Sequence, residues 1–309
     1  MSDANRTRLV YLNETTWNTP ATGQMVELRM TGESLIPEVE TINSAELRSD
    51  RMISDVIQIS RQNSGGFDFE LSYATFDSLL ESAMFNAWAT DTLKNSTTKK
   101  SFTIEKQHQD IDEYFLFSGM IVNTFTLNLA TSSICTGNFS FLGSSAALDQ
   151  SSAAASVTIA NTNDVINCMG NVASLMEGDY SGAYTNLNGI YIQELSFTIN
   201  NNLRPVFAIG SDVIMEVAVG KMDVTGTMNC YFTNDRLFDK FLAGSALKLQ
   251  YQLEDAAGNS YTFTFPRVKF ETESVTAPGQ DQDVIENLSW RALKDNTSSC
   301  QVQIDRVTA

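Results

Sequence analysis

The residues whose types suit catalysis gather in two acidic stretches, and one of these holds the single histidine of the chain. His108 lies in the sequence EKQHQDIDEY, where a strand pattern ends. The acidic side chains are Asp110, Asp112 and Glu113 in the first stretch and Asp281 and Asp283 in the second. A histidine could activate a nucleophile for acyl transfer, and paired carboxylates could flank a glycosidic bond. Because both stretches are rich in Gln and Asp, their composition favours solvated turns, and the sequence disfavours an enzyme.

The sequence also gives no pattern for a metal, a phosphate group or a dinucleotide. The cysteines are Cys135, Cys168, Cys230 and Cys300; they are far apart and form no C-x-x-C pair, so with one histidine they make no zinc pattern. Neither acidic stretch matches a calcium loop, and no G-x-x-x-x-G-K-[ST] occurs. We therefore expect no cofactor and no metal, and we interpret the cysteines as small apolar residues of the core.

The charge balance restricts the classes of partner. Among 309 residues, 37 are acidic and 20 are basic, which gives a formal net charge of −17. Proteins that grip nucleic acid use Lys and Arg on phosphates, so this balance argues against such a protein and for a surface that repels a polyanion. No stretch is apolar over the length that spans a bilayer, and the first residues show no secretory signal, so we expect no membrane association.

The elements that must position these residues are mostly strands. Apolar and polar residues alternate at 25–30, 67–73, 101–107 and 125–129, and again in several segments of the C-terminal half. This alternation is typical of antiparallel sheets with one buried face.

Helical spacing is rare and predicts two short helices. The first lies in TFDSLLESAMFNAW, with Thr75 as a candidate N-terminal cap. The second lies in NDRLFDKFLAG, with Asn234 as the candidate cap and Gly244 as the C-terminal stop.

The same order of elements occurs twice along the chain. SGGFDFELSYATFDSLLESAM, from residue 64, has a counterpart in VTGTMNCYFTNDRLFDKFLAGSA, from residue 224. In the same way ETINSAELRS (40–49) matches FTINNNLRP (197–205), GMIVNTFTLNL (119–129) matches FPRVKFETESV (265–275), and GNFSFLG (137–143) matches ENLSWRA (286–292). The Ser- and Ala-rich segment 144–156 between the halves is typical of a loop or linker.

We therefore predict two related units in a mainly β chain with short helices. The first unit covers residues 1–149 and begins with an arm, residues 1–23, that has few core signals and packs across a neighbour. Residues 150–309 hold the linker and the second unit. Each unit is expected to be an antiparallel β-sandwich or half-barrel flanked by one α-helix.

The sequence resembles the tail tube proteins, also called major tail proteins, of long-tailed bacteriophages with non-contractile tails. The residues that carry the resemblance are TRLVYLNETTWNTPATGQMVELRMTGESL (7–35), SAELRSDRMISDV (44–56), GGFDFELSYATFDSLLESAM and LSFTINNNLRP (195–205). The resemblance implies β-subunits that join their sheets around a channel, in rings that stack into a tube. A chain with two units resembles the variant in which three chains close a ring with pseudo-six-fold symmetry.

The resemblance also implies a role and partners. The protein would be a structural component of the virion tail, assembled in the host bacterial cytoplasm. Its partners would be further copies of itself, the tape-measure protein, and the tail terminator and tail-tip proteins. Viral DNA would pass through the lumen without specific binding, since an acidic lumen repels phosphate.

Two loops are the candidate contacts between rings. In the family, the long loop after an early strand contacts the neighbouring ring, and this loop corresponds here to residues 45–62, with a counterpart near 201–221. The candidate residues are Glu46, Arg48, Asp50, Arg51 and Asp55 in the first loop and Arg204 and Asp212 in the second. Charges of both signs could dock on a complementary segment, and the alternative is a solvated charged loop.

Two other classes of protein stay open at this point. Another phage ring, baseplate or capsid-associated protein could share the β-fold and the acidity but would not stack into a tube. A carbohydrate-binding β-protein would need exposed aromatic side chains, and the candidates are Trp17, Trp88 and Trp290. Trp88 follows a predicted helix, and Trp290 lies at one of the apolar positions of an alternating strand. Both are therefore typical of packing residues.

Overall fold

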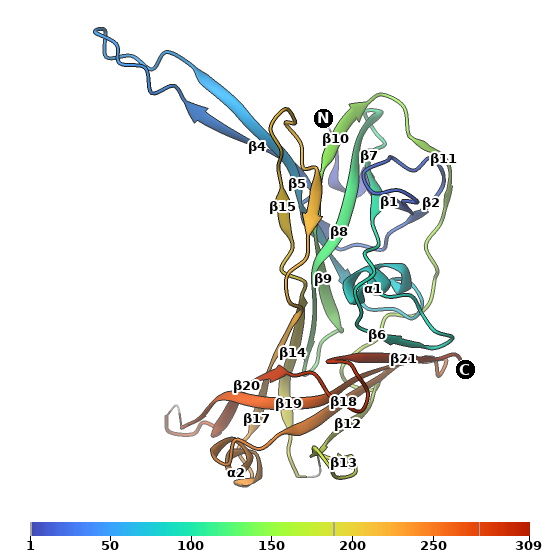
Figure 1. The fold of residues 1–309 in the computed structure, drawn as a ribbon. Helices are drawn as coiled ribbons and strands as arrows, with labels where there is room; N and C mark the ends of the chain where they lie inside the picture. Colours follow the sequence, from blue (N-terminus) through green and yellow to red (C-terminus); the bar gives the residue numbers. More distant parts are fainter. Residues whose placement is uncertain (1, 188, 278) are drawn as a thin grey trace.

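The computed structural model describes residues 2–187, 189–277 and 279–309, and strands dominate it (Figure 1). The N-terminal half contains η1 (Ala4–Arg6), β1 (Thr7–Asn13), β2 (Gly23–Glu27), β3 (Gly32–Glu33), β4 (Ile36–Asn43), β5 (Val56–Glu70), α1 (Asp77–Met84), β6 (Thr92–Lys94), β7 (Phe102–His108), β8 (Glu113–Ala130), β9 (Thr136–Gly143) and β10 (Ser145–Asp149). After β11 (Ala154–Thr158), the C-terminal half contains β12 (Val172–Asp179), β13 (Thr185–Asn186), β14 (Ile192–Asn200), β15 (Arg204–Val206), β16 (Glu216–Ala218), β17 (Asp223–Tyr231), α2 (Arg236–Leu242), β18 (Leu247–Glu254), β19 (Ser260–Thr276), β20 (Ile285–Ala292) and β21 (Gln303–Val307).

One sheet runs through both halves. Its strands follow the order β4, β5, β9, β8, β14, β17, β20 and β19, and each neighbouring pair is antiparallel. The halves meet where β8 pairs with β14, so the hydrogen-bonded ladder continues from one half into the other. We call this β8–β14 pairing the seam.

The two longest strands of the halves, β8 and β19, each belong to two sheets. The N-terminal part of β8 pairs with β7 and β10, and β7 leads on to β1 and β2. The N-terminal part of β19 pairs with β18 and β21, and β18 leads on to β12 and β13. A bulge separates the two parts of each strand, at 117–120 in β8 and at 265–268 in β19. Because a bulge bends its strand, one strand can serve two sheets and curve each half into a half-barrel.

The strand pairings repeat from one half to the other, so the chain is a duplicated antiparallel β-unit with one α-helix in each copy. We call β1–β10 the first unit and β12–β21 the second unit. Gly65 of β5 lies opposite Phe141 of β9, and Gly226 of β17 lies opposite Trp290 of β20. A Cβ atom would overlap the backbone of Ser34 at Gly65 and the ring of Trp290 at Gly226. Both strands therefore require glycine at the same place, and the predicted fold class is confirmed.

Aromatic side chains fill the cores of the two units and make them continuous. In the first unit these are Phe67, Phe69, Phe76, Phe125 and Phe139, and in the second they are Phe197, Tyr251, Phe263, Phe265 and Trp290; all are buried. The rings of Phe125 and Phe197 meet edge to face across the seam, with their centroids 5.9 Å apart. Such pairs add stability beyond the burial of their area, so the seam holds a core of its own.

Both predicted helices exist, but neither predicted N-terminal cap lies at the cap position, which is held by Phe76 at α1 and by Asp235 at α2. Helix α1 begins after Phe76 without a side-chain cap, because the Thr75 hydroxyl instead bonds Ser72 and Asn161. At α2 the Asn234 side chain accepts a hydrogen bond from the Arg236 N–H at 3.1 Å. Gly244 ends α2 with a φ of 58°, a conformation that favours glycine, as predicted.

The prediction that the N-terminal arm has few core residues is wrong for residues 7–13, whereas its packing across a neighbour stays a prediction. Residues Thr7–Asn13 form β1, which pairs along its whole length with β7 and buries Leu9 and Val10. Met1 lies outside the described residues. The linker is likewise built into a sheet, because β11 pairs in parallel with β2.

Two of the matched segments of the repeat are shifted against the structure. Ile36 pairs with Ser64, the residue before Gly65, and Thr198 pairs with Thr225, the residue before Gly226. Thr198 therefore corresponds to Ile36. It does not correspond to Thr41, which the similar sequences ETIN and FTIN suggest. The match between 119–129 and 265–275 is shifted by two residues, and the match between 137–143 and 286–292 is correct. A two-residue shift keeps every side chain on its own face, so sequence periodicity does not detect it.

Candidate functional site: the seam, the polar face and two arms

The seam has a defined register with a different chemistry on each face of the sheet. Residues 194–200 of β14 pair with 124–130 of β8, and Thr198 lies directly opposite Thr126. The hydroxyl oxygens of these two threonines are 2.9 Å apart and share a hydrogen bond. On the other face Phe197 lies opposite Leu127, and both side chains are buried.

Small polar side chains cover the face of the sheet that looks away from the aromatic core. We call this surface the polar face, and its bonded pairs are Thr124 with Ser140 (2.6 Å), Thr126 with Thr198, Ser196 with Thr227 (2.8 Å), Thr272 with Ser289 (2.5 Å), Asn138 with Asp68 (2.7 Å) and Asn229 with Glu194 (3.0 Å). The pair Thr272–Ser289 occupies in the second unit the place of Thr124–Ser140 in the first. The duplication has therefore preserved the chemistry of this face.

The charged side chains with bonds on the polar face are mostly carboxylates. Asp68 and Glu194 accept hydrogen bonds from asparagine amides. Asp223 and Glu271 flank Arg291, whose guanidinium lies 2.7 Å and 2.6 Å from them. The resulting excess of negative charge repels phosphate groups.

The first arm, residues 39–60, is the free end of the β4–β5 hairpin and projects away from the body of the molecule (Figure 1). All five residues predicted for the first loop lie on it and are exposed. Arg48 bonds Asp50 through two nitrogens, at 3.1 and 2.7 Å, and approaches Glu46 at 3.8 Å. The hydrogen bonds from Arg48 hold the pKa of the Asp50 carboxyl below its usual value. The structure thus brings these three residues together and leaves Arg51 and Asp55 apart from them.

Large apolar side chains on the first arm were missed by the sequence reasoning. They are Val39, Ile42, Leu47, Met52, Ile53, Val56, Ile57 and Ile59, and all are exposed. A cluster of exposed apolar side chains is typical of a surface that contacts another protein.

The second arm, residues 201–222, contains the β15–β16 hairpin and folds back over the first unit (Figure 1). Ile214 and Val217 are each 1% exposed and pack with Phe85, Ile121 and Leu142. Lys99 lies 3.3 Å from Glu216 and donates to the carbonyl of Val217 at 2.6 Å.

The two charged residues predicted for the second arm differ in their surroundings. Asp212 forms an ion pair with Arg61 of the first unit. Arg204 lies exposed on β15. The two equivalent arms therefore adopt different positions within one chain.

A half-buried acid, Glu273, lies beside the buried Glu286 near the open edge of the second unit. Burial, and next the neighbouring Glu286, raises the pKa of the Glu273 carboxyl to about 8. Oxygen Oε1 of Glu286 and both carboxyl oxygens of Glu273 are shielded from solvent without a hydrogen-bond partner among the described residues. Glu273 occupies the position that Phe125 occupies in the first unit, so its side chain lies on the core face of the sheet. The sequence alone gives no sign of this, because an acidic residue in a strand usually lies on the exposed face.

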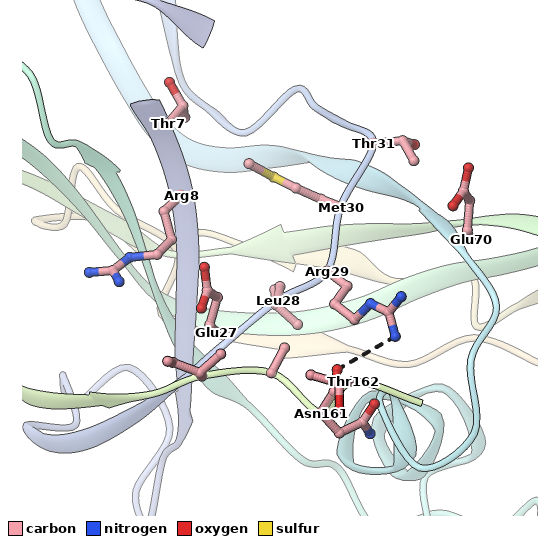
Figure 2. Close-up of a pocket in the computed structure, with 12 residues that line it drawn as sticks. Thr7, Arg8, Glu27, Leu28, Arg29, Met30, Thr31, Glu70, Asn161 and Thr162 are labelled. Carbon is pink, nitrogen blue, oxygen red and sulfur yellow. Dashed lines mark hydrogen bonds between the residues drawn. The ribbon is translucent and has the colours of Figure 1, made fainter. Parts of the chain in front are cut away.

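A cavity of about 570 Å³ between β1, the segment after β2 and the segment after β11 offers no reactive constellation among its lining residues (Figure 2). Arg29 in its wall donates to the carbonyl oxygens of Asn163 (2.6 Å) and Asn161 (3.5 Å), so it fastens the segment after β11 to the first unit. His108, the candidate base, lies outside this wall and bonds the hydroxyls of Ser2 and Thr7. Within the described residues no group of three or more His, Cys, Asp or Glu side chains could hold a metal ion, and no helix is long and apolar enough to cross a membrane.

The cysteines and tryptophans lie mostly inside the protein. Sulfur atoms of Cys135 and Cys168 are 3.2 Å apart as free thiols, a proximity that their separation in sequence concealed. Trp290 is fully buried, Trp88 packs under the guanidinium of Arg306, and Trp17 donates to the carbonyl of Gly119 at 3.1 Å. These contacts are typical of packing residues and give no support to a sugar-binding surface.

A family model described as a phage tail tube protein matches residues 4–292. No curated protein matches the chain.

Proposed function

Since the chain belongs to the phage tail tube protein family and is thus a structural component of a virion tail, we propose that it forms the tube from stacked rings of three chains. The observation that carries this proposal is the seam, where two copies of one unit share a single sheet within one chain. A ring of six units needs six such joints. Three chains would supply three internal seams and three joints between chains, which gives pseudo-six-fold symmetry.

The polar face is proposed to line the lumen. The aromatic core and both helices lie away from this face, and the face itself presents hydroxyls, amides and carboxylates. Negative charge on it would repel DNA phosphates within the Debye length of about 10 Å at 0.1 M salt. Viral DNA would therefore pass without specific binding, and the tape-measure protein would fill the same channel before ejection.

The tip of the first arm is proposed to contact the next ring. Residues 45–52 project beyond the sheet and carry Glu46, Arg48, Asp50 and Arg51. Rings stacked head to tail would bring this tip onto the neighbouring ring, while Arg204 and Asp212 would contribute from the second arm. The ends of the tube would be met by the tail terminator and tail-tip proteins, and assembly would take place in the host cytoplasm.

Electron microscopy of the purified protein, with averages of end-on views, tests the proposal. Stacked rings with six lobes and three-fold symmetry are the expected result. Closed rings with true six-fold symmetry would contradict the pairing of two units per chain. Rings or trimers that never stack would favour the alternative of a baseplate or capsid-associated protein.

A further inference from the structure

The shared sheet ends in two edges that pair with no further strand among the described residues. One edge is the segment 32–38, which contains β3 and the start of β4 and pairs only with β5. At this edge the Leu35 N–H and C=O bond Glu33 Oε2 and Lys106 Nζ, each at 3.0 Å, and an added strand would replace these two bonds. The other edge is the C-terminal part of β19, residues 270–276, which pairs only with β20. Unpaired edges recruit further strands unless they are blocked.

We propose that these two edges pair with each other between copies of the chain, in the register of the internal seam. This inference rests on the proposed ring and names the residues that close it. Its support is that both edges are equivalent, residue by residue, to the two strands that already meet inside the chain.

The segment 32–38 is equivalent to β14. Ile36 lies opposite Ser64 of β5, and Thr198 lies opposite Thr225 of β17. Ser64 and Thr225 each precede the glycine that both units require. Ile36 of the first unit therefore occupies the position of Thr198, the threonine that bonds Thr126 across the seam.

The open part of β19 is equivalent to the part of β8 that receives β14. Thr124 lies opposite Ser140 of β9, and Thr272 lies opposite Ser289 of β20, with a one-residue bulge just before each threonine. Counting two residues onward, Ser274 occupies the position of Thr126.

The register between chains follows directly. Ile36 of one chain would face Ser274 of the next, as Thr198 faces Thr126. The flanking pairs would be Leu35 with Val275, on the core side, and Glu38 with Thr272, on the polar face. Antiparallel addition of this kind supplies backbone hydrogen bonds, and alternate side chains fix the register.

The first arm carries a second sign of this interface. Its residues Ile53-Ser54-Asp55-Val56 repeat Ile214-Met215-Glu216-Val217 of the second arm. The backbone supports this match. In the first arm the Ser44 N–H donates to the carbonyl oxygen of Asp55, and in the second arm the equivalent residues Val206 and Glu216 lie opposite each other in the β15–β16 hairpin.

The two matching segments differ in what covers them. Ile214 and Val217 are each 1% exposed on the unit across the seam, whereas Ile53 and Val56 are 67% and 56% exposed. An arm that carries the same aliphatic residues without cover would pack in the same way across the joint between chains.

The receiving surface lies on the second unit of the neighbouring chain. There Lys269 and Arg291 hold the positions of Ile121 and Leu142, which receive the second arm in the first unit. Aliphatic stems of Lys and Arg can cover Ile53 and Val56. The charged end of Lys269 suits Asp55, whereas the guanidinium of Arg291 already lies between Asp223 and Glu271. The occupant of the open edge is thus a second copy of this chain.

Disulfide trapping in assembled rings or tubes tests the register. Side chains directly opposite on antiparallel strands have Cβ atoms about 4.5–5.5 Å apart, close to what a disulfide requires. An equimolar mixture of Ile36→Cys and Ser274→Cys chains, assembled under reducing conditions and then oxidised, should give covalent dimers that contain one chain of each kind. A mixture of Glu38→Cys and Thr272→Cys chains tests the same register independently.

Mixtures of Ile36→Cys and Thr272→Cys chains are the control, because a shift of two residues places their Cβ atoms too far apart for efficient bonding. Each single variant alone reports any reaction of the native cysteines. Rings or tubes in which neither in-register mixture forms dimers, or in which the control forms as many, would overturn the register and leave the proposed function standing. Absence of rings and tubes from wild-type protein would overturn both.

Discussion

Thr126 of the first unit and Thr198 of the second unit share a hydrogen bond of 2.9 Å across the seam, a strand pair that joins the two halves of the chain as the β6–β21 pair also does. The bond lies on the polar face, and directly behind it the buried rings of Phe125 and Phe197 meet. One strand pair therefore combines a hydrated surface with a packed core, as the strands within each unit do. The joint between units is built like the interior of a unit, so the chain should unfold with both units coupled.

Removal of the Phe197 ring should destabilise the whole chain. Its centroid lies 5.2 Å from those of Phe263 and Phe265, and the side chain is fully packed. We expect Phe197→Ala to lower the free energy of unfolding by about 3–5 kcal/mol, since the cavity adds to the lost burial. Urea denaturation followed by tryptophan fluorescence measures this change. The neighbouring Ser196→Ala, on the polar face, is the control and should cost less than about 1 kcal/mol.

Stability should depend on pH through Glu273. Because burial raises the pKa of its carboxyl from 4.5 to about 8, the folded chain holds this proton more tightly than the unfolded chain. The free energy of unfolding should therefore be highest below pH 4.5 as far as this group is concerned, and should fall as the pH rises toward 8. Glu273→Gln should remove this fall and stabilise the chain at pH 8 by about 1–2 kcal/mol, since partial solvent access screens the repulsion.

Urea titrations at pH 5, 6, 7 and 8 would measure this difference. The exposed Asp283→Asn variant makes the same change in net charge and should keep the wild-type slope. An equal slope in the Glu273→Gln variant and the wild-type protein would contradict the assignment.

Charge reversal at the tip of the first arm should weaken stacking without affecting the fold. We expect Arg48→Glu combined with Arg51→Glu to reduce tube formation several-fold. The free energy of unfolding should change by less than about 0.5 kcal/mol, because exposed ion pairs such as Arg48–Asp50 contribute little. Negative-stain images and sedimentation measure the tubes. Tubes of normal length and abundance would exclude the tip as a contact between rings, and reversal of the exposed Lys294 is the control.

Equivalent isoleucines of the two arms should respond in opposite ways. Ile214→Ala removes a side chain that is packed within the chain, so it should lower the free energy of unfolding by about 2–4 kcal/mol. Ile53→Ala removes an exposed one and should leave the unfolding of the monomer unchanged within about 0.5 kcal/mol while weakening assembly. Chemical denaturation of monomer and light scattering of assembling protein separate the two effects. Normal assembly of the Ile53→Ala variant would argue against docking of the first arm.

The sequence by itself determined the class of fold, the order of elements and the duplication. Alternation of apolar and polar residues is a local property, so the strands around Phe67, Phe125 and Phe197 could be recognised without their partners. The two short helices followed from local spacing in the same way. The excess of acidic residues argued against a protein that binds nucleic acid through its phosphates, because net charge follows from composition alone.

The tertiary structure alone decided which strands pair and in what register. The similar sequences ETIN (40–43) and FTIN (197–200) suggest a match that the structure contradicts. Thr198 corresponds to Ile36, because the strand pairing next to Gly65 and Gly226 sets the alignment. Alternation has a period of two, so it leaves the partner and the register of a strand undetermined. A polar N-terminal segment can also join a sheet through a distant strand, as β1 does with β7, whose paired residues are 89 to 101 positions away.

Only the three-dimensional arrangement separated the two arms. Ile53 and Ile214 stand in similar sequences, yet one is exposed and the other is buried against Ile121 and Leu142. The second arm has the first unit beside it in the same chain. The surface for the first arm is proposed to belong to a neighbouring chain. Burial depends on what lies across a joint, and local sequence does not contain that information.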